Sequence, residues 1–286
     1  MRYMTLCLLS VSFARPTESV LDLTLARAAA YVRSYHQDFS VLVAEEQYVQ
    51  RSTVPLRSGG GRWVLEGTSD HAEERTMRSE FMLVRGGGHE EMWLAFRDVL
   101  DVNGHATESQ RGRLEEWLTQ ASGTFRERAR ALALEQARYN LGDIVRTINV
   151  PTLPLEFLLA ERQARFRFKA AGEATMNGVK VLIISFEERE RPTLIRTPTG
   201  DNVPARGAFW IDPVTGRVFS SELRTGEKER NRLRATIRVT YEIAPKLLML
   251  VPVLMAETYQ SSTIQIAATA RYSNYRRFET KARLVR

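Results

Sequence analysis

Alternation of apolar and polar residues with a period of two dominates the C-terminal half of the sequence. Four apolar residues between positions 237 and 243 alternate with polar ones, and residues 264–272 repeat the pattern. Successive side chains of a β-strand point to opposite faces of a sheet, so this alternation predicts strands with one buried face. Because short turns separate such segments from about residue 164 onward, the sequence predicts an antiparallel meander.

One of these turns, DPVTG at 212–216, follows a tryptophan and could be mistaken for the edge of an active site. Asp212 is suited to the first position of a turn, Pro213 fixes φ at the next, and Gly216 permits a positive φ. We therefore interpret the segment as a hairpin turn between strands at 207–211 and 217–225, in which Asp212 caps the turn.

Three helices are expected outside this meander. Apolar residues at three- and four-residue spacing predict an amphipathic helix over 19–39, with Ser19 and Asp22 at its start. A capping-box pattern begins a second helix at 124–139. A third, short and strongly apolar, is expected at 154–160, with a proline in its first turn. A helix this apolar requires a covering surface.

The N-terminal half also contains strand-like segments, separated by glycine-rich turns. Neither glycine triplet has the pattern of a phosphate-binding loop, so both are interpreted as turns. Asn103-Gly104 is a strong signal for a tight hairpin turn. The expected strands are 41–51, 75–85 and 92–102.

The residues that carry catalytic or metal chemistry are sparse. The four histidines lack the spacing of a zinc site on a helix, and no nucleophile elbow occurs. Asp98 and Asp101 lie three apart on an expected strand, which predicts that they point to opposite faces. We therefore expect no enzyme activity, no cofactor and no metal. The histidines are His36, His71, His89 and His105.

The N-terminus and the overall charge suggest a compartment and a class of surroundings. Residues 1–14 combine Arg2, a short apolar run and small residues before Ala14, which predicts a secretory signal. The only cysteine, Cys7, lies inside this segment. We expect an exported, periplasmic protein in which 15–286 form a single domain. A net charge of +7 favours anionic surroundings such as a membrane surface or an acidic partner.

The apolar faces of these elements are candidates for a binding cavity. A curved antiparallel sheet encloses a groove when one face is apolar and a helix caps it. The same residues are equally expected as plain core in a sheet packed on helices. Nucleic-acid binding is not expected, because basic and acidic residues alternate and no RNP-like spacing of aromatics occurs. The candidate ligand-binding residues are Leu155, Phe157, Leu158, Trp210, Ile237, Val239, Tyr241, Val253 and Met255.

Three segments of the second half carry a resemblance to a known family. They are GAFWIDPVTGRVFSSELRT, the pair VTYEI and VPVLMAETY, and ATARYSNYRRF, all within residues 207–278. With the order of elements over 20–280, they resemble the periplasmic lipoprotein-carrier superfamily (LolA/LolB-like), including outer-membrane lipoprotein-sorting proteins. The resemblance implies an α+β fold in which an unclosed, strongly curved antiparallel half-barrel wraps around a few helices.

The same resemblance implies a function without catalytic residues. A carrier of this kind holds acyl chains in an apolar cavity between sheet and helices, so the expected partner is a lipid or a lipidated protein. The carriers' lid-locking arginine has four competing counterparts here, Arg51, Arg75, Arg78 and Arg85, and none is preferred. A protein-interaction or envelope-stress regulatory module with a filled core and no lipid ligand is the alternative. The sequence does not define the oligomeric state.

Overall fold

In the computed structural model, one antiparallel sheet contains all the strands found among the described residues. The structure describes residues 19–39, 42–53, 73–85, 93–108, 135–142, 146–197, 199–226, 233–262 and 264–277. The predicted signal at 1–14 and most of the predicted helix 124–139 lie outside these ranges. The eleven strands are β1 (Leu42–Thr53), β2 (Glu73–Arg85), β3 (Trp93–Val102), β4 (His105–Ala106), β5 (Phe166–Met176), β6 (Val179–Glu188), β7 (Ala205–Ile211), β8 (Val218–Thr225), β9 (Arg234–Ala244), β10 (Met249–Gln260) and β11 (Gln265–Arg277).

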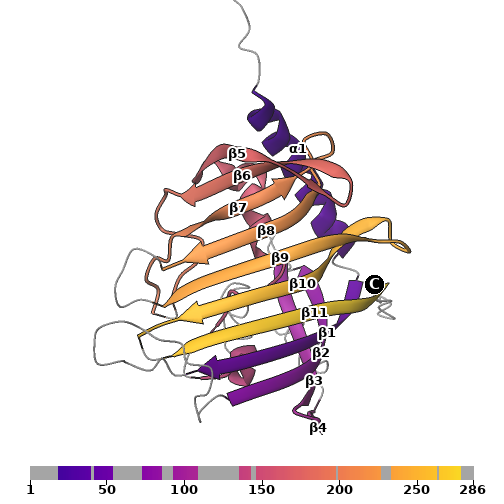
Figure 1. The fold of residues 1–286 in the computed structure, drawn as a ribbon, viewed down its shortest axis with the longest axis vertical. Helices are drawn as coiled ribbons and strands as arrows, with labels where there is room; N and C mark the ends of the chain where they lie inside the picture. The colour runs from indigo at the N-terminus through magenta and orange to yellow at the C-terminus, as the bar shows by residue number, and fades with distance from the viewer. Residues whose placement is uncertain are drawn as a thin grey trace, which may run out of the picture.

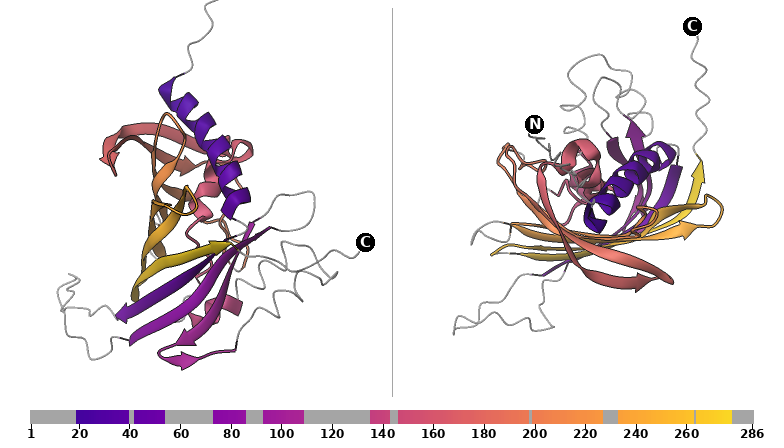
Figure 2. Two further views of the ribbon diagram at one scale, coloured as in Figure 1. Left: turned by 90° about the vertical axis from the view of Figure 1, so that its right-hand side faces the viewer. Right: turned by 90° about the horizontal axis from the view of Figure 1, so that it is seen from above.

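The strand order places the first strand of the chain beside the last. The sheet runs β4-β3-β2-β1-β11-β10-β9-β8-β7-β6-β5, and β1 pairs with β11 from Leu42 opposite Arg277 to Thr53 opposite Gln265. It is open, with β4 and β5 at its edges, and it twists and curves around the helices on one side (Figures 1 and 2). The predicted α+β fold, an unclosed curved antiparallel sheet around a few helices, is confirmed.

Helix α1 (Val20–Phe39) lies on the concave side of the sheet, as the amphipathic pattern predicts (Figure 2). Ser19 begins it, because the Asp22 backbone N–H donates to Ser19 Oγ at 3.1 Å and Ser19 Oγ donates to the Asp22 carboxylate at 2.6 Å. One face of the helix is buried, which fixes its position on the sheet. The buried residues are Thr24, Leu25, Ala28, Ala29, Val32, Tyr35, His36 and Phe39.

The described part of the connection from β4 to β5 lies on the concave side, and we call these residues, 135–142 and 146–165, the crossover segment. It contains two 3₁₀ helices, η1 (Ala137–Tyr139) and η2 (Leu153–Leu158), and the single α-helical turn α4 (Ala160–Gln163). The short apolar helix predicted at 154–160 is present as η2, which is a 3₁₀ helix. Hydrogen bonds to the third residue back hold η2, and the extended ψ of 136° at Leu159 separates it from α4.

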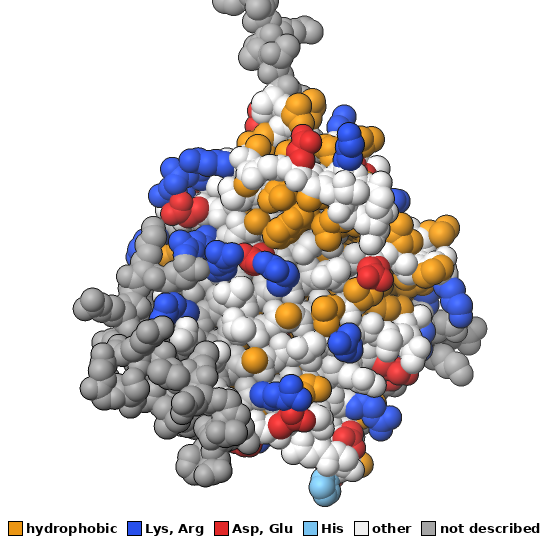
Figure 3. Space-filling model, in the orientation of Figure 1, with side chains coloured by type: hydrophobic (Ala, Val, Ile, Leu, Met, Phe, Trp, Pro, Cys, Tyr) orange, Lys and Arg blue, Asp and Glu red, His pale blue; other side chains and the backbone are white. Residues whose placement is uncertain are grey.

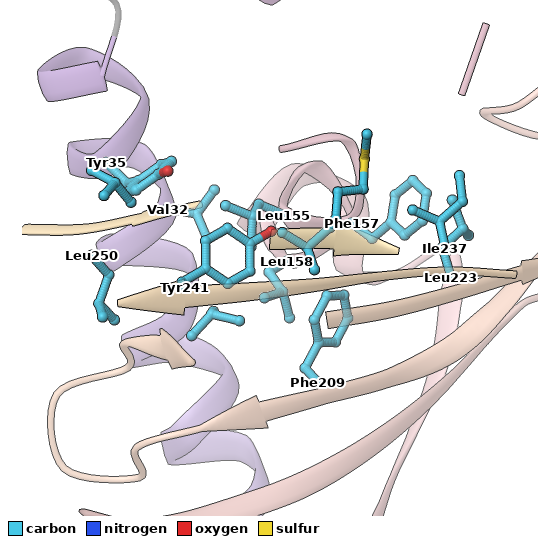
Figure 4. Close-up of a cluster of buried hydrophobic side chains, with 14 of the residues drawn as sticks. Val32, Tyr35, Leu155, Phe157, Leu158, Phe209, Leu223, Ile237, Tyr241 and Leu250 are labelled. Carbon is cyan, nitrogen blue, oxygen red and sulfur yellow. The ribbon is translucent and has the colours of Figure 1, made fainter. Parts of the chain in front are cut away.

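The apolar half of the core lies between α1, η2 and strands β6 to β10 (Figure 4). Side chains from the helix, the 3₁₀ turn and the sheet interdigitate there. Phe157 stacks on Phe166 with ring centroids 4.9 Å apart, and Phe186 stacks on Phe209 at 4.8 Å. Burial of these large side chains stabilises the fold roughly in proportion to the apolar area removed from water.

The DPVTG segment is the predicted turn between β7 and β8, and it also holds α1. The Val214 backbone N–H donates to Asp212 Oδ1 at 2.9 Å, so Asp212 caps its own turn as expected. Arg27 of α1 donates from Nη1 to the Pro213 carbonyl at 2.6 Å. Gly216, at φ +75°, lies so close that an added Cβ would be 2.3 Å from the Arg27 carbonyl carbon. The turn is thus a docking point for the helix.

We expect Gly216→Ala to destabilise the fold through this contact. A methyl group there would have to push α1 away, in addition to the strain of a positive φ. Gly178, at φ +79° with nothing within 4 Å of an added Cβ, is the matched control. In urea denaturation, Gly178→Ala should lower the free energy of unfolding by about 1 kcal/mol and Gly216→Ala by about 3 kcal/mol. Equal losses would contradict the docking role.

Candidate functional site

A cavity of about 180 Å³ lies on the concave side, between the crossover segment and strands β2 and β3. Its wall has two chemical characters. The sheet contributes apolar Phe81, Leu83 and Ala95, whereas the crossover segment and Arg97 contribute most of the polar groups. The lining residues are Phe81, Leu83, Ala95, Arg97, Gln136, Ala137, Asn140, Arg146, Thr147, Asn149, Val150, Thr152, Leu153 and Glu156.

Strand β1 explains why polar groups occur on this side of the sheet. Its alternation places Glu46, Tyr48 and Gln50 on the concave face, where none of them has measurable exposure. Glu46 lies opposite Ser79 and Tyr272 in the neighbouring strands, and both of these residues are also buried. The concave face is therefore apolar over β6 to β9 and polar over β1. A cluster of buried polar groups in one region requires mutual pairing.

Arg97 of β3 and Glu46 of β1 form a buried ion pair beside the cavity. Arg97 donates from Nε to Glu46 Oε2 and from Nη2 to Glu46 Oε1 at 2.8 Å, and Nη2 also reaches the Asn149 carbonyl at 3.3 Å. Its guanidinium lies 5.5 Å from the centre of the Tyr48 ring. Burial acts to lower the pKa of Arg97, but the charge and hydrogen bonds of Glu46 hold that pKa above its usual value. Arg97 is consequently charged, and Glu46 neutralises it.

Arg146 joins the crossover segment to β1. Its Nη1 donates to the Tyr48 hydroxyl at 3.3 Å and its Nη2 donates to Gln50 Oε1, while the guanidinium lies 5.1 Å from the centre of the Tyr259 ring. Gln50 also accepts from the Leu141 backbone N–H at 3.0 Å. Two distant parts of the chain are thus held together by one buried polar network.

Glu257 and Tyr259 of β10 extend this network. The Tyr259 hydroxyl donates to Glu257 Oε2 at 2.7 Å, and Glu257 is 2% exposed. Burial raises the pKa of Glu257, an effect opposed by the Tyr259 hydrogen bond and by the charges of Arg146 and Arg97. Glu257 interacts with the charge of Arg146, but burial disfavours its own charged form.

A second charged cluster joins α1 to the crossover segment. Glu156 Oε1 lies 3.2 Å from His36 Nε2, and Glu156 Oε2 lies 2.6 Å from Arg162 Nη1. Burial and then Arg162 lower the pKa of His36 to about 4. Burial raises the pKa of Glu156 to about 7, although Arg162 opposes this shift. Arg162 is the permanent cation of this cluster and the ion-pair partner of Glu156. His36 is a neutral ring at neutral pH, because its pKa is lowered to about 4.

The nine residues predicted to bind ligand occupy a different place from this cavity, and none of them lines it. Seven are buried in the apolar half of the core: Leu155, Phe157, Leu158, Ile237, Val239, Tyr241 and Met255. Trp210 is half-buried on the convex face, where Arg238 lies 6.0 Å from its ring centre. Val253 is half-buried at a register irregularity between β9 and β10.

The expectation for Asp98 and Asp101 is wrong. A register irregularity between β2 and β3 pairs Asp98 with Glu80 and Asp101 with Arg78, so both aspartates face the same side of the sheet.

Of the arginines considered as counterparts of a lid-locking residue, Arg51 and Arg78 are exposed. Arg75 donates to the Tyr139 carbonyl at 3.2 Å and so helps to fasten the crossover segment.

The convex face differs from this interior. Lys and Arg side chains lie interspersed there with Asp and Glu, and apolar side chains gather in the upper part of the view (Figure 3). Arg276 pairs with Glu80 and Arg238 with Glu222, which agrees with the mixed charge pattern of the sequence.

Among the described residues, no group of three or more His, Cys, Asp or Glu side chains is placed to hold a metal ion. None of the described helices is both long and apolar enough to cross a membrane.

Comparisons with known proteins find similar structures but no sequence match. No family model matches the chain, and no curated protein sequence does. A domain assigned as an outer membrane lipoprotein-sorting protein from Vibrio parahaemolyticus is 12% identical with a TM-score of 0.40, covering 91% of this chain and 95% of its own.

Two further solved structures are similar over most of their length. A LolA superfamily protein from Nitrosomonas europaea is 8% identical with a TM-score of 0.32, covering 88% of this chain and 93% of its own. A chain of the MucA/MucB complex of Pseudomonas aeruginosa is 8% identical with a TM-score of 0.21, covering 88% and 99%. The proteins found include the kind that the sequence resembles, and no residue role is carried over from them.

We expect removal of one partner of the Arg97–Glu46 pair to lower the free energy of unfolding strongly. Replacement of both partners by apolar residues should lower it much less. Arg97→Met alone leaves Glu46 buried without its counterion and should lower the free energy of unfolding by about 3–5 kcal/mol. The double variant Arg97→Met/Glu46→Leu removes both charges and should recover most of that loss. Urea denaturation of the two variants measures this, and a double variant no more stable than the single one would contradict the pairing.

The lowered pKa of His36 predicts a pH-dependent stability. Below pH 6.5 the unfolded chain protonates this ring, but the folded chain does not until about pH 4. The contribution of neutral His36 to the free energy of unfolding is thus fully present above pH 6.5 and is lost as the pH falls towards 4. Relative to His36→Gln, the wild type should lose roughly 3 kcal/mol between pH 7 and pH 4. A constant difference between the two proteins across this range would show that His36 is not held neutral.

Proposed function

We propose that this protein is a non-enzymatic, periplasmic binder of lipid acyl chains or of a lipidated protein, with the ligand held on the concave side of the sheet. The observation that supports this function is the cavity beneath the crossover segment, whose wall combines apolar strand residues with a few buried polar groups. Small-molecule sites have this composition, in which apolar area supplies affinity and a few polar groups fix orientation.

The size of the cavity limits what enters it in this conformation. A dry cavity of about 150 Å³ accommodates one benzene molecule, so 180 Å³ takes one end of an amphipathic molecule rather than a full set of acyl chains. Phe81, Leu83 and Ala95 would contact its first carbons. The remainder of a long chain needs further apolar surface.

Helix η2 lies between the cavity and that further surface. Leu153 and Glu156 line the cavity, whereas Leu155, Phe157 and Leu158 pack into the apolar half of the core. We propose that a longer acyl chain displaces η2 and reaches the predicted binding residues on β9 and β10, namely Ile237, Val239, Tyr241, Val253 and Met255. Trp210, which lies on the convex face, would take part only at the outer surface. A 3₁₀ helix has poorer hydrogen-bond geometry than an α-helix, which makes η2 suited to such movement.

The alternative function is a protein-interaction or envelope-stress regulatory module without a lipid ligand. The observation that favours it is the close packing of the apolar half, in which Leu155, Phe157 and Leu158 are at most 1% exposed. In this case η2 is plain core, and the cavity holds only water. Lipid uptake separates the two functions.

Filling the cavity should abolish ligand binding without unfolding the protein. Ala95→Phe on β3 introduces a ring into the cavity, whereas Ala256→Phe places the same ring on the exposed convex face of β10. We expect Ala95→Phe to weaken binding of a fluorescent fatty acid at least tenfold and Ala256→Phe to leave it unchanged. The measurement is fluorescence titration, with native mass spectrometry of detergent-free protein.

Two outcomes would contradict the proposed function. Wild-type protein that carries no acyl species and takes up no added fatty acid would exclude a lipid binder and favour the regulatory module. Uptake that Ala95→Phe leaves intact would place the lipid outside the cavity.

A further inference from the structure

Arg146 is a buried cation whose charge the protein balances incompletely. It is 2% exposed and lines the cavity. Its two terminal nitrogens donate to the neutral oxygens of Tyr48 and Gln50, and its Nε has no hydrogen-bond partner among the described residues. Within the described part of the chain, Arg146 also forms no ion pair with a carboxylate. A buried guanidinium with an unused donor beside a cavity requires an explanation.

The acids around the cavity are committed elsewhere or are poor counterions. Glu46 is the bidentate partner of Arg97. Glu156, which lines the cavity, lies 2.6 Å from Arg162. Glu257 is hydrogen-bonded to Tyr259, and its burial favours the neutral acid. With these three acids accounted for, Arg146 is the cation that lacks an anionic partner among the described residues.

We propose that Arg146 is the anion-binding subsite of the cavity and that the ligand is an amphiphile with a carboxylate or phosphate head group. This inference rests on the proposed function, because it concerns the same cavity. Arginine suits this role, since its planar donors match the oxygens of both anions and it remains charged when buried. Apolar Phe81, Leu83 and Ala95 on the sheet side would receive the chain that follows the head group.

A free lipid and a lipidated protein differ in the charge at the lipid end. The acylated N-terminal cysteine of a lipidated protein is joined through thioether, ester and amide groups and carries no anion at its lipid end. A fatty acid or a phospholipid does carry one. The chemistry around Arg146 therefore favours a free anionic lipid over a protein-bound acyl group.

Three probes of equal chain length test the head group directly. We would titrate wild-type protein with dodecanoate, dodecyl phosphate and dodecanol in detergent-free buffer by isothermal calorimetry. We expect at least one of the two anions to bind at least tenfold more tightly than dodecanol, which is about 1.4 kcal/mol. Tighter binding of dodecanoate would indicate a fatty acid, and tighter binding of dodecyl phosphate would indicate a phospholipid.

Variants then assign the preference to Arg146. Arg146→Gln should reduce the preference of either anion over dodecanol to less than twofold. The control Arg271→Gln removes one positive charge from an exposed site on β11 and should keep the wild-type preference. Gln50→Glu provides an internal carboxylate at the atom that now accepts from Arg146 Nη2. It should abolish the preference while Arg146 stays in place, which keeps the test valid if Arg146→Gln does not fold.

The outcomes distinguish this inference from the function on which it rests. If wild-type protein binds dodecanol as tightly as both anions, the anion subsite is refuted and lipid binding stands. If Arg271→Gln lowers the preference as much as Arg146→Gln, the effect is one of overall charge and the subsite is refuted. If none of the three probes binds, the lipid function itself fails.

Discussion

The pairing of β1 with β11 determines where a ligand site can form. Because the first strand lies beside the last, β4 and β5 become opposite edges of the sheet, and the chain between them must cross its full width. Its described part crosses on the concave side, fastened there by Gln50 and Arg75 through hydrogen bonds to residues 139–141. The crossover segment is therefore a lid over the polar strands because of the topology.

The two halves of the concave side are stabilised by different forces. Between α1 and β6 to β10, apolar side chains pack closely and contribute roughly in proportion to the area that they bury. Under the crossover segment, buried charges must be matched one by one, and each mismatch costs more than a lost apolar contact. Helix η2 lies on the boundary and takes part in both, since Leu158 packs in the core and Glu156 pairs with Arg162.

The sequence predicted the fold better than the site, and β1 shows why. Clean alternation in β9 and β11, the cap of α1 and the turn at Asp212 each depend on neighbouring residues, so local pattern is sufficient to predict them. In β1, however, Glu45 and Gln47 alternate with Glu46 and Tyr48, and both faces are polar enough to be exposed. Only the crossover segment decides which face is buried. Arg97 and Arg146 were missed for the same reason, because their partners on β1 are 51 and 96–98 residues away.

Leaving Arg146 incompletely paired costs the protein stability. A buried polar donor without a partner costs about 1–3 kcal/mol, and more when it belongs to a charged group. Gln50 accepts from Arg146 with a neutral amide oxygen where a glutamate of nearly the same shape would have supplied the missing charge. Local imperfections of this kind concentrate at functional sites, where a ligand supplies the missing partner. The amide of Gln50 also serves the fold, because its Nε2 donates to the Tyr139 carbonyl at 3.1 Å. What the fold leaves unexplained is the buried charge of Arg146 with its unused Nε, and an anion that comes and goes from the cavity would explain it.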